Sequence, residues 1–201
     1  MDRVEEILEY WLGDTLRDVS CAKEWMSFWF ESGADLDQPI REKFAADVEA
    51  AASGETKLWE QNARGRLAKI LLLDQFTRNI FRGKPEAFAN DDEALALTQA
   101  GIIAGHDGQL GPVERVFFYM PMQHAESLPV QMQSVALYEA LAESVPDSVK
   151  KLFGGFTKYA ELHRDIVARF GRFPHRNAIL GRESTPEERE YLAGDAPTFG
   201  Q

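Results

Sequence analysis

The chain has 201 residues, of which 44% are hydrophobic and 11% aromatic, a composition that excludes a disordered protein. Its net charge of −11 disfavours nucleic acid and anionic membranes as partners. No apolar run is long enough for a membrane span, and no charged-then-apolar leader opens the chain. A single cysteine, Cys21, fits a reducing compartment. We therefore expect one cytoplasmic domain over residues 1–193, followed by a flexible tail over 194–201.

Apolar residues recur at spacings of three and four along most of the chain, which is typical of amphipathic helices. No sustained alternation of apolar and polar residues supports a strand. The fold class is therefore predicted to be all-α. In chain order, the expected helical segments are 4–12, 25–30, 37–54, 58–59, 64–81, 90–105, 112–121, 129–141 and 146–170, with a short last helix from Thr185. The segment 146–170 is either continuous or interrupted at Gly154-Gly155.

Local signals predict several helix ends. Asp37 is placed to cap the third segment, and Asn90 with Glu93 has the spacing of a capping box. Pro121 is expected to kink or end its helix, because proline removes a backbone hydrogen bond. A second capping box with proline at the first helical position begins at Thr185.

Positive charge gathers in two parts of this acidic chain. Between Asn62 and Lys84 there are six basic residues and one acid, and between His163 and Arg182 there are five arginines and one acid. This uneven distribution is the first indication of a site for a negatively charged partner.

The segment over 64–81 is apolar on nearly all sides, so it is predicted to be a central helix. Asp74 and Arg78 project from one of its apolar faces, and Arg82 follows one turn later. Because burial of an unpaired charge costs several kcal/mol, these side chains must be paired or must face a polar cavity. An internal ion pair that fixes helix packing and a functional site are the two alternatives.

A second group of polar residues lies near the end of the chain. His163 is at the centre of the apolar face of the helix over 156–170, where a histidine is either a hydrogen-bonded core residue or part of a site. The irregular segment that follows contains Arg172, His175, Arg176 and Asn177. The alternative role for the two arginines is to bind carbonyl groups at a helix C-terminus.

The third group lies at the proline of the segment 112–126. Pro121 is expected to free backbone groups and to expose His124 and Glu126 near a helix break. These residues and the other histidines are also possible metal ligands, but no HExxH or comparable spacing is present. We therefore predict no metal and no cofactor.

Three long motifs carry a family resemblance: LAKILLLDQFTRNIFRG over 67–83, YMPMQHAE over 119–126 and RFGRFPHRN over 169–177. In this order they resemble the bacterial family called domain of unknown function 924. The resemblance implies a fold similar to tetratricopeptide repeats, an antiparallel helical array that forms an α-α superhelix, and it implies no activity. The family usually has serine where this chain has Ala125, so a serine nucleophile is not available there.

Two functions are compatible with these groups of residues. The first is a cationic pocket that binds a small anionic ligand, with or without catalysis, because arginine offers forked donors and histidine transfers protons. The second is a helical adaptor that binds an acidic peptide. The identity of the ligand, any reaction and the oligomeric state stay open. The predicted ligand-binding residues are Asp74, Arg78, Arg82, His163, Arg172, Arg176 and Asn177, and the predicted catalytic residues are His124, Glu126 and His175.

Overall fold

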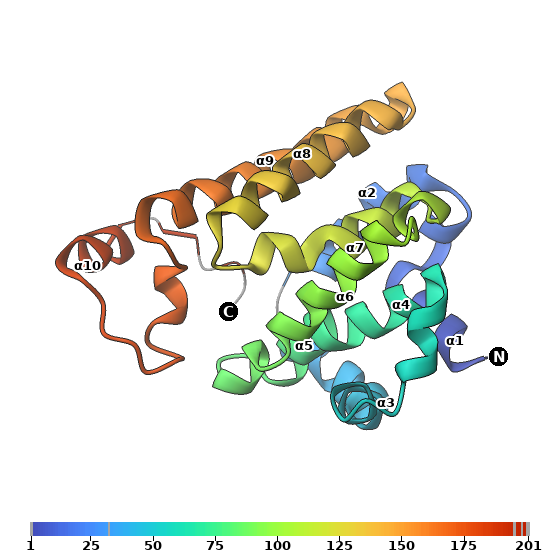
Figure 1. Ribbon diagram of the computed structural model, residues 1–201, viewed down its shortest axis with the longest axis horizontal. Helices are drawn as coiled ribbons and strands as arrows, with labels where there is room; N and C mark the ends of the chain where they lie inside the picture. The colour runs from blue at the N-terminus through green and yellow to red at the C-terminus, as the bar shows by residue number, and fades with distance from the viewer. Residues whose placement is uncertain (1, 32, 195, 198, 200–201) are drawn as a thin grey trace.

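The computed structural model describes residues 2–31, 33–194, 196–197 and 199, and within them it contains helices and no strand (Figure 1). The predicted all-α class is confirmed. No helix of the described residues is long and apolar enough to cross a membrane. The α-helices are α1 (Arg3–Leu12), α2 (Ala22–Phe30), α3 (Ala34–Ala52), α4 (Ala63–Ile70), α5 (Thr77–Ile80), α6 (Asp91–Ile103), α7 (Pro112–His124), α8 (Leu128–Ser144), α9 (Asp147–Phe170) and α10 (Pro186–Leu192).

Shorter helical elements connect these helices. A π-helical stretch, η4 (Leu71–Phe76), joins α4 directly to α5. The 3-10 helices are η1 (Gly13–Leu16), η2 (Val19–Cys21), η3 (Lys57–Gln61), η5 (Pro85–Phe88), η6 (Asp107–Gln109) and η7 (Pro174–Arg176).

Aromatic rings from distant parts of the chain pack together in the core. Trp11 of α1 lies 5.3 Å from Phe76 and 5.8 Å from Phe117 between ring centroids, and Phe44 lies 4.8 Å from Phe76. The indole N–H of Trp29 donates a hydrogen bond of 2.7 Å to the carbonyl oxygen of Trp11. These contacts hold α1, α2, α3, η4 and α7 in one body.

The pair α8 and α9 lies along one side of the molecule, with the two helices side by side (Figure 1). Both contact α7, and the hydroxyl of Tyr138 donates to the carbonyl oxygen of Val116 at 2.6 Å, which ties α8 to α7. The helix α9 ends at Gly171, whose φ of 71° is left-handed and suits glycine. The tetratricopeptide-like superhelix implied by the family resemblance stays a prediction.

The segment predicted as one helix over 64–81 is continuous, but its geometry is not uniform. In η4 the hydrogen bonds widen to the π pattern, and the Thr77 hydroxyl donates to the carbonyl oxygen of Leu72 at 2.9 Å. Such π-helical turns occur frequently at functional sites. Asp74 and Gln75 lie within this stretch, so the local distortion coincides with the polar residues of the central helix.

Two of the predicted helix starts rest on caps that are not formed. The helix α3 begins before Asp37, whose carboxylate instead accepts hydrogen bonds from Arg82. Asn90 precedes α6 as expected but makes no capping hydrogen bond through its side chain, and Glu93 pairs with Lys69 at 2.7 Å. In both cases a distant basic side chain takes the carboxylate, and local sequence does not reveal such a partner.

The other two helix signals have different outcomes. The helix α7 continues through the buried Pro121 to His124, so of the two expected effects of this proline the helix end is wrong, and the kink stays a prediction. The side-chain amide of Gln131 donates to the carbonyl oxygens of Gln123 and Ala125, at 2.6 and 2.8 Å, and so completes the later end of α7. The capping box that begins at Thr185 is confirmed at the start of α10.

Residues 195, 198, 200 and 201 of the tail predicted over 194–201 lie outside the described residues. Phe199 is described, and its ring lies 4.0 Å from the ring of His163 between centroids. Phe199 therefore lies against α9.

Candidate functional site

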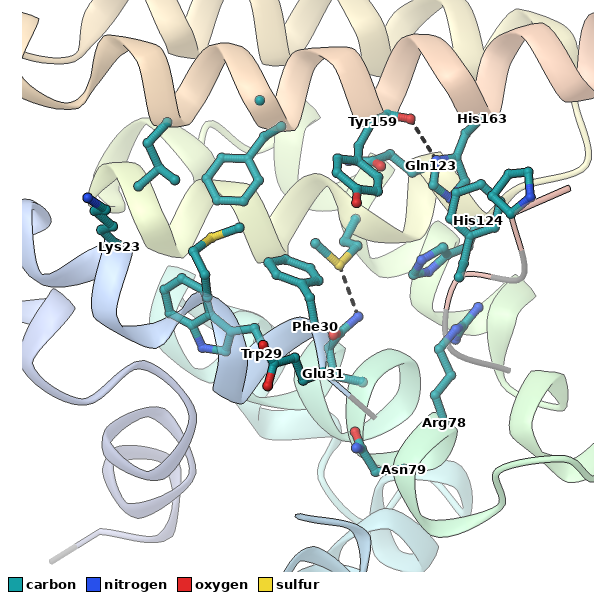
Figure 2. A pocket seen from close by; sticks show the side chains of 18 of the residues that line it. Lys23, Trp29, Phe30, Glu31, Arg78, Asn79, Gln123, His124, Tyr159 and His163 are labelled. Carbon is teal, nitrogen blue, oxygen red and sulfur yellow. Dashed lines mark hydrogen bonds between the residues drawn. The ribbon is translucent and has the colours of Figure 1, made fainter. Parts of the chain in front are cut away.

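A cavity of about 880 Å³ lies between α2, α5, α7 and α9, and the segment after α9 also contributes to its wall (Figure 2). Its volume is typical of a site for a small molecule. Side chains from all three sequence motifs meet there. The predicted site residues that line it are Arg78, Arg82, His124, His163, His175 and Arg176.

Asp74 holds His124 in place from behind the cavity wall. The Asp74 side chain is 0% exposed, and its Oδ1 lies 2.7 Å from Nδ1 of His124, the last residue of α7. Burial acts to raise the pKa of Asp74, but the charge of Arg78 and the contacts with His124 outweigh it and hold this pKa well below its usual value. Because an ionised carboxylate only accepts hydrogen bonds, Nδ1 of His124 carries the hydrogen and Nε2 keeps a lone pair.

Two arginines share the carboxylate of Asp91 at the same end of the cavity. Arg78 contacts Oδ1 of Asp74 at 3.0 Å and Oδ1 of Asp91 at 2.9 Å, and Nη1 of Arg176 lies 3.3 Å from Oδ2 of Asp91. Asp91 acts as a bridge between helix α6, the central helix and the segment after α9.

Arg176 is a buried cation with few polar partners. The residue is 6% exposed, and among the described residues its Nε has no hydrogen-bond partner. The guanidinium lies between the rings of Phe88 and Phe173, 4.8 and 4.5 Å from their centroids. Burial and the nearby charge of Arg78 lower the pKa of Arg176 to about 10. This guanidinium is therefore less compensated than that of Arg78, which contacts two acids.

Three histidines at this end are held in the neutral form. Burial lowers the pKa of His163 to about 3, and burial together with Arg176 lowers that of His175 to about 3. Burial and Arg78 lower the pKa of His124, against the opposing effect of Asp74. Nδ1 of His163 lies 2.7 Å from the carbonyl oxygen of Tyr159, so this nitrogen donates and Nε2 is again the acceptor.

Arg82 lines the cavity, but its charge is engaged by an acid. Its Nε and Nη2 contact the two carboxylate oxygens of Asp37 at 2.7 and 2.9 Å, a bidentate pair. The side chain of Asn79 also donates to Asp37 at 2.9 Å. Arg82 is thus part of the wall near the site, with its position set by α3.

Three of the predicted ligand-binding residues lie outside the lining of this cavity: Asp74, which lies behind its wall, and Arg172 and Asn177, which lie in the segment after α9. Arg172 makes a bidentate pair with Glu188 at 2.6 and 2.7 Å, and Nδ2 of Asn177 contacts the same carboxylate at 3.2 Å. These contacts join the segment after α9 to the capping box of α10. In this geometry both residues hold the polypeptide that carries His175 and Arg176.

Glu126 likewise supports this segment. Its carboxylate accepts hydrogen bonds from the backbone N–H of Phe173 at 2.8 Å and from Arg182 at 2.6 and 2.9 Å. It lines an adjoining cavity of about 410 Å³, to which His124 and Arg176 also contribute. Glu126 is therefore close to the site but on the other side of these two residues.

The sequence interpretation missed two kinds of residue at the site: an acid that lines the adjoining cavity and aromatic residues that line the main cavity. Asp91 matched the common pattern of acids at a helix start, so nothing marked it as a partner of Arg78 and Arg176. Trp29 and Phe30 occur in a segment dense in aromatic residues, a pattern typical of a buried core, so nothing in the sequence marks them as cavity residues. Among the described residues, no group of three or more histidine, cysteine or acidic side chains is arranged to hold a metal.

Comparison with known proteins identifies the family. A family model described as "Bacterial protein of unknown function (DUF924)" matches residues 7–196. The chain belongs to this family. The resemblance inferred from the three motifs is thus confirmed, and the DUF924 match includes every residue that the sequence predicts for the site.

A solved structure of a protein of unknown function from Agrobacterium tumefaciens is similar to this DUF924 chain. The two are 39% identical, the match covers 94% of this chain and 96% of the other, and the TM-score is 0.78. No curated protein matches the sequence. Because these relatives are described without an activity, the function must be argued from the cavity.

Proposed function

We propose that the protein binds a small anionic molecule in the 880 Å³ cavity, with Arg176 and Arg78 as its cationic contacts. The observation that carries this proposal is the state of Arg176. It is 6% exposed, its acidic partner Asp91 is shared with Arg78, and its Nε has no partner among the described residues. Charge-assisted hydrogen bonds from a guanidinium favour a carboxylate or phosphate group.

The enclosed position of these arginines favours a small molecule over a peptide partner. An adaptor that binds an acidic peptide needs cationic side chains on an open groove. Arg78 and Arg176 are both buried, and three neutral histidines surround them. This arrangement is typical of a pocket that takes one charged group out of water.

The pair Asp74 and His124 also gives the site a means of proton transfer. An acidic partner that fixes the tautomer and orientation of a histidine is a recurrent feature of general bases. Nε2 of His124 is the free acceptor in this pair, and His124 lines the cavity next to Arg78 and Arg176. We therefore assign His124 the role of base toward a bound anion that carries an acidic proton.

The test is a comparison of anions with a neutral analogue at constant chain length. Hexanoate and hexyl phosphate are expected to stabilise the protein against heat, whereas hexanol is not. The variant R176Q should lose this stabilisation and at least about tenfold in affinity by calorimetry, because charge-assisted hydrogen bonds contribute about 1.5–3 kcal/mol.

The matched control is R164Q, because Arg164 lies on α9, outside the cavity lining, and pairs with Asp165. Its affinity for hexanoate should equal that of the wild type. Equal stabilisation by hexanol and hexanoate, or unchanged binding of both anions in R176Q, contradicts the proposal.

A further inference from the structure

We infer that the ligand of this site is amphipathic: an organic anion whose charged group lies at Arg176 and Arg78 and whose apolar body extends between α2 and α9. The inference rests on the proposed function and adds the chemical class of the ligand. It follows from the way polar and apolar side chains are separated within one cavity.

The polar and apolar parts of the cavity lie at different ends. Figure 2 shows Arg78, His124 and His163 together on one side, and Trp29 and Phe30 on the other. The lining at the apolar end comes from α2 and the first half of α9, and includes Met26, Trp29, Phe30, Val149, Leu152 and Phe156. An anion without an apolar body would occupy only the first end.

The cavity contains aromatic surface that the described residues leave exposed. Phe30, at the apolar end, is 46% exposed, and Tyr159, which lies between this end and His163, is 58% exposed, although both line the cavity. The Phe30 ring also contacts two rings of the protein: its centroid lies 6.1 Å from that of Phe156 and 6.4 Å from that of Phe117. Covering such surface is favourable in proportion to the apolar area removed from water. An apolar ligand body would provide that cover.

The charged residues of this end do not contradict an apolar occupant. Lys23, Glu31 and Lys151 also line the cavity, and all three side chains are exposed. Exposed lysines keep their charge in water while their carbon chains lie along apolar surface. We therefore place these three residues at the opening and the ligand body below them.

Gly155 keeps space for that body. It lies within α9 and lines the cavity, and a Cβ built on it would meet no atom within 4 Å. Glycine within a helix is unfavourable relative to alanine or leucine. The neighbouring Gly154 has equally open space around its Cβ position but is outside the cavity lining. The two glycines thus form a matched pair for a test.

The experiment measures the affinity for hexanoate, octanoate and decanoate by calorimetry, with decanol as the uncharged analogue. Affinity should rise about fourfold with each buried methylene group, so that decanoate, with four more such groups, binds about 250-fold more tightly than hexanoate. The variant G155L should reduce this preference to about tenfold or less, because leucine fills the apolar end. The variant G154L should keep the wild-type preference.

Each outcome separates the two proposals. Equal affinity for hexanoate and decanoate, or the same preference in G155L as in G154L, overturns the amphipathic ligand while the anion site stands. Binding of decanol as tight as that of decanoate, with decanoate binding unchanged in R176Q, overturns the anion site. Failure of all three carboxylates to bind overturns both. The unfolding temperature of each glycine variant without ligand verifies that it is folded.

Discussion

Nδ1 of His124 lies 2.7 Å from Oδ1 of Asp74, across 50 residues of sequence and at the junction of η4 and α7. The contact joins a residue in a π-helical stretch to the last residue of a helix. Because the carboxylate is fully buried and ionised, it determines which nitrogen of the histidine carries the hydrogen.

The variant D74N should change both the tautomer and the pKa of His124. The charge of Asp74 raises the pKa of His124 in the wild type, so its removal should lower that pKa further. Nitrogen-15 NMR should find hydrogen on Nδ1 of His124 in the wild type and a mixture of tautomers in D74N. His163 is the internal control, because its Nδ1 donates to a backbone carbonyl and should be unaffected. A higher pKa of His124 in D74N would argue against this electrostatic role.

The stability of the fold should fall as the pH decreases from about 6.5 toward 4.5. The pKa of His163 is about 3 in the folded protein and 6.5 as the ordinary value, so the unfolded chain binds more protons in this window. Stability therefore decreases as pH falls, by about 1.4 kcal/mol per pH unit for each such histidine. Depressed carboxyl pKa values, such as that of Asp74, contribute below this window, because their ordinary values are lower.

Urea unfolding at pH 7, 6 and 5 measures this dependence. The variant H163N has no titrating group at this position, and its free energy of unfolding should change less between pH 6 and 5 than that of the wild type. An identical pH dependence of the free energy of unfolding in the two proteins would contradict this prediction. It would show that His163 is protonated in the folded state or does not contribute to the loss of stability at low pH.

Binding of an anion should be coupled to proton uptake. Burial and the positive charge of Arg78 disfavour protonation of His124 and lower its pKa, whereas Asp74 and Asp91 favour protonation. A bound anion adds its negative charge to those of Asp74 and Asp91 and so raises the pKa of His124. The affinity for hexanesulfonate, which stays anionic, should therefore increase as the pH falls. The increase is up to about tenfold per pH unit where binding takes up one proton.

Calorimetry in two buffers of different ionisation enthalpy counts the protons taken up on binding. The variant H124Q should take up fewer protons than the wild type at pH 5.5. Affinity that is independent of pH between 5.5 and 7.5 is incompatible with this coupling.

Arg172 and Arg176 are four residues apart and should behave differently when each is replaced by glutamine. Arg172 pairs with the buried Glu188, so R172Q should lower the free energy of unfolding and leave hexanoate binding unchanged. The contact with Arg172 lowers the pKa of Glu188 to about 2, so this stabilisation is present above the ordinary value of 4.5 and is lost as the pH falls toward 2.

Chemical denaturation and calorimetry on R172Q and R176Q distinguish the two roles. Loss of ligand affinity in R172Q at full stability would assign Arg172 to the site. Loss of stability without loss of affinity in R172Q supports the role of Arg172 in holding η7 in place.

The sequence alone determined the helical class, most helix positions and the family. For example, the helix predicted over 146–170 is α9 (Asp147–Phe170), and the capping box at Thr185 is formed. These features depend on interactions within a few residues, namely the period of apolar side chains, backbone capping and glycine at helix ends, and such interactions are visible in a linear pattern.

Only the tertiary structure decided which charged residues face the cavity. Arg172 and Arg176 occur in one motif, yet Arg172 pairs with Glu188 and Arg176 lines the cavity. Phe30 belongs to an aromatic stripe that suggests core, yet it is 46% exposed. The fate of a charge or ring on an apolar face depends on the side chain that a distant helix places opposite it. The packing of the helices against one another determines that partner, so the spacing of residues along one helix does not predict it.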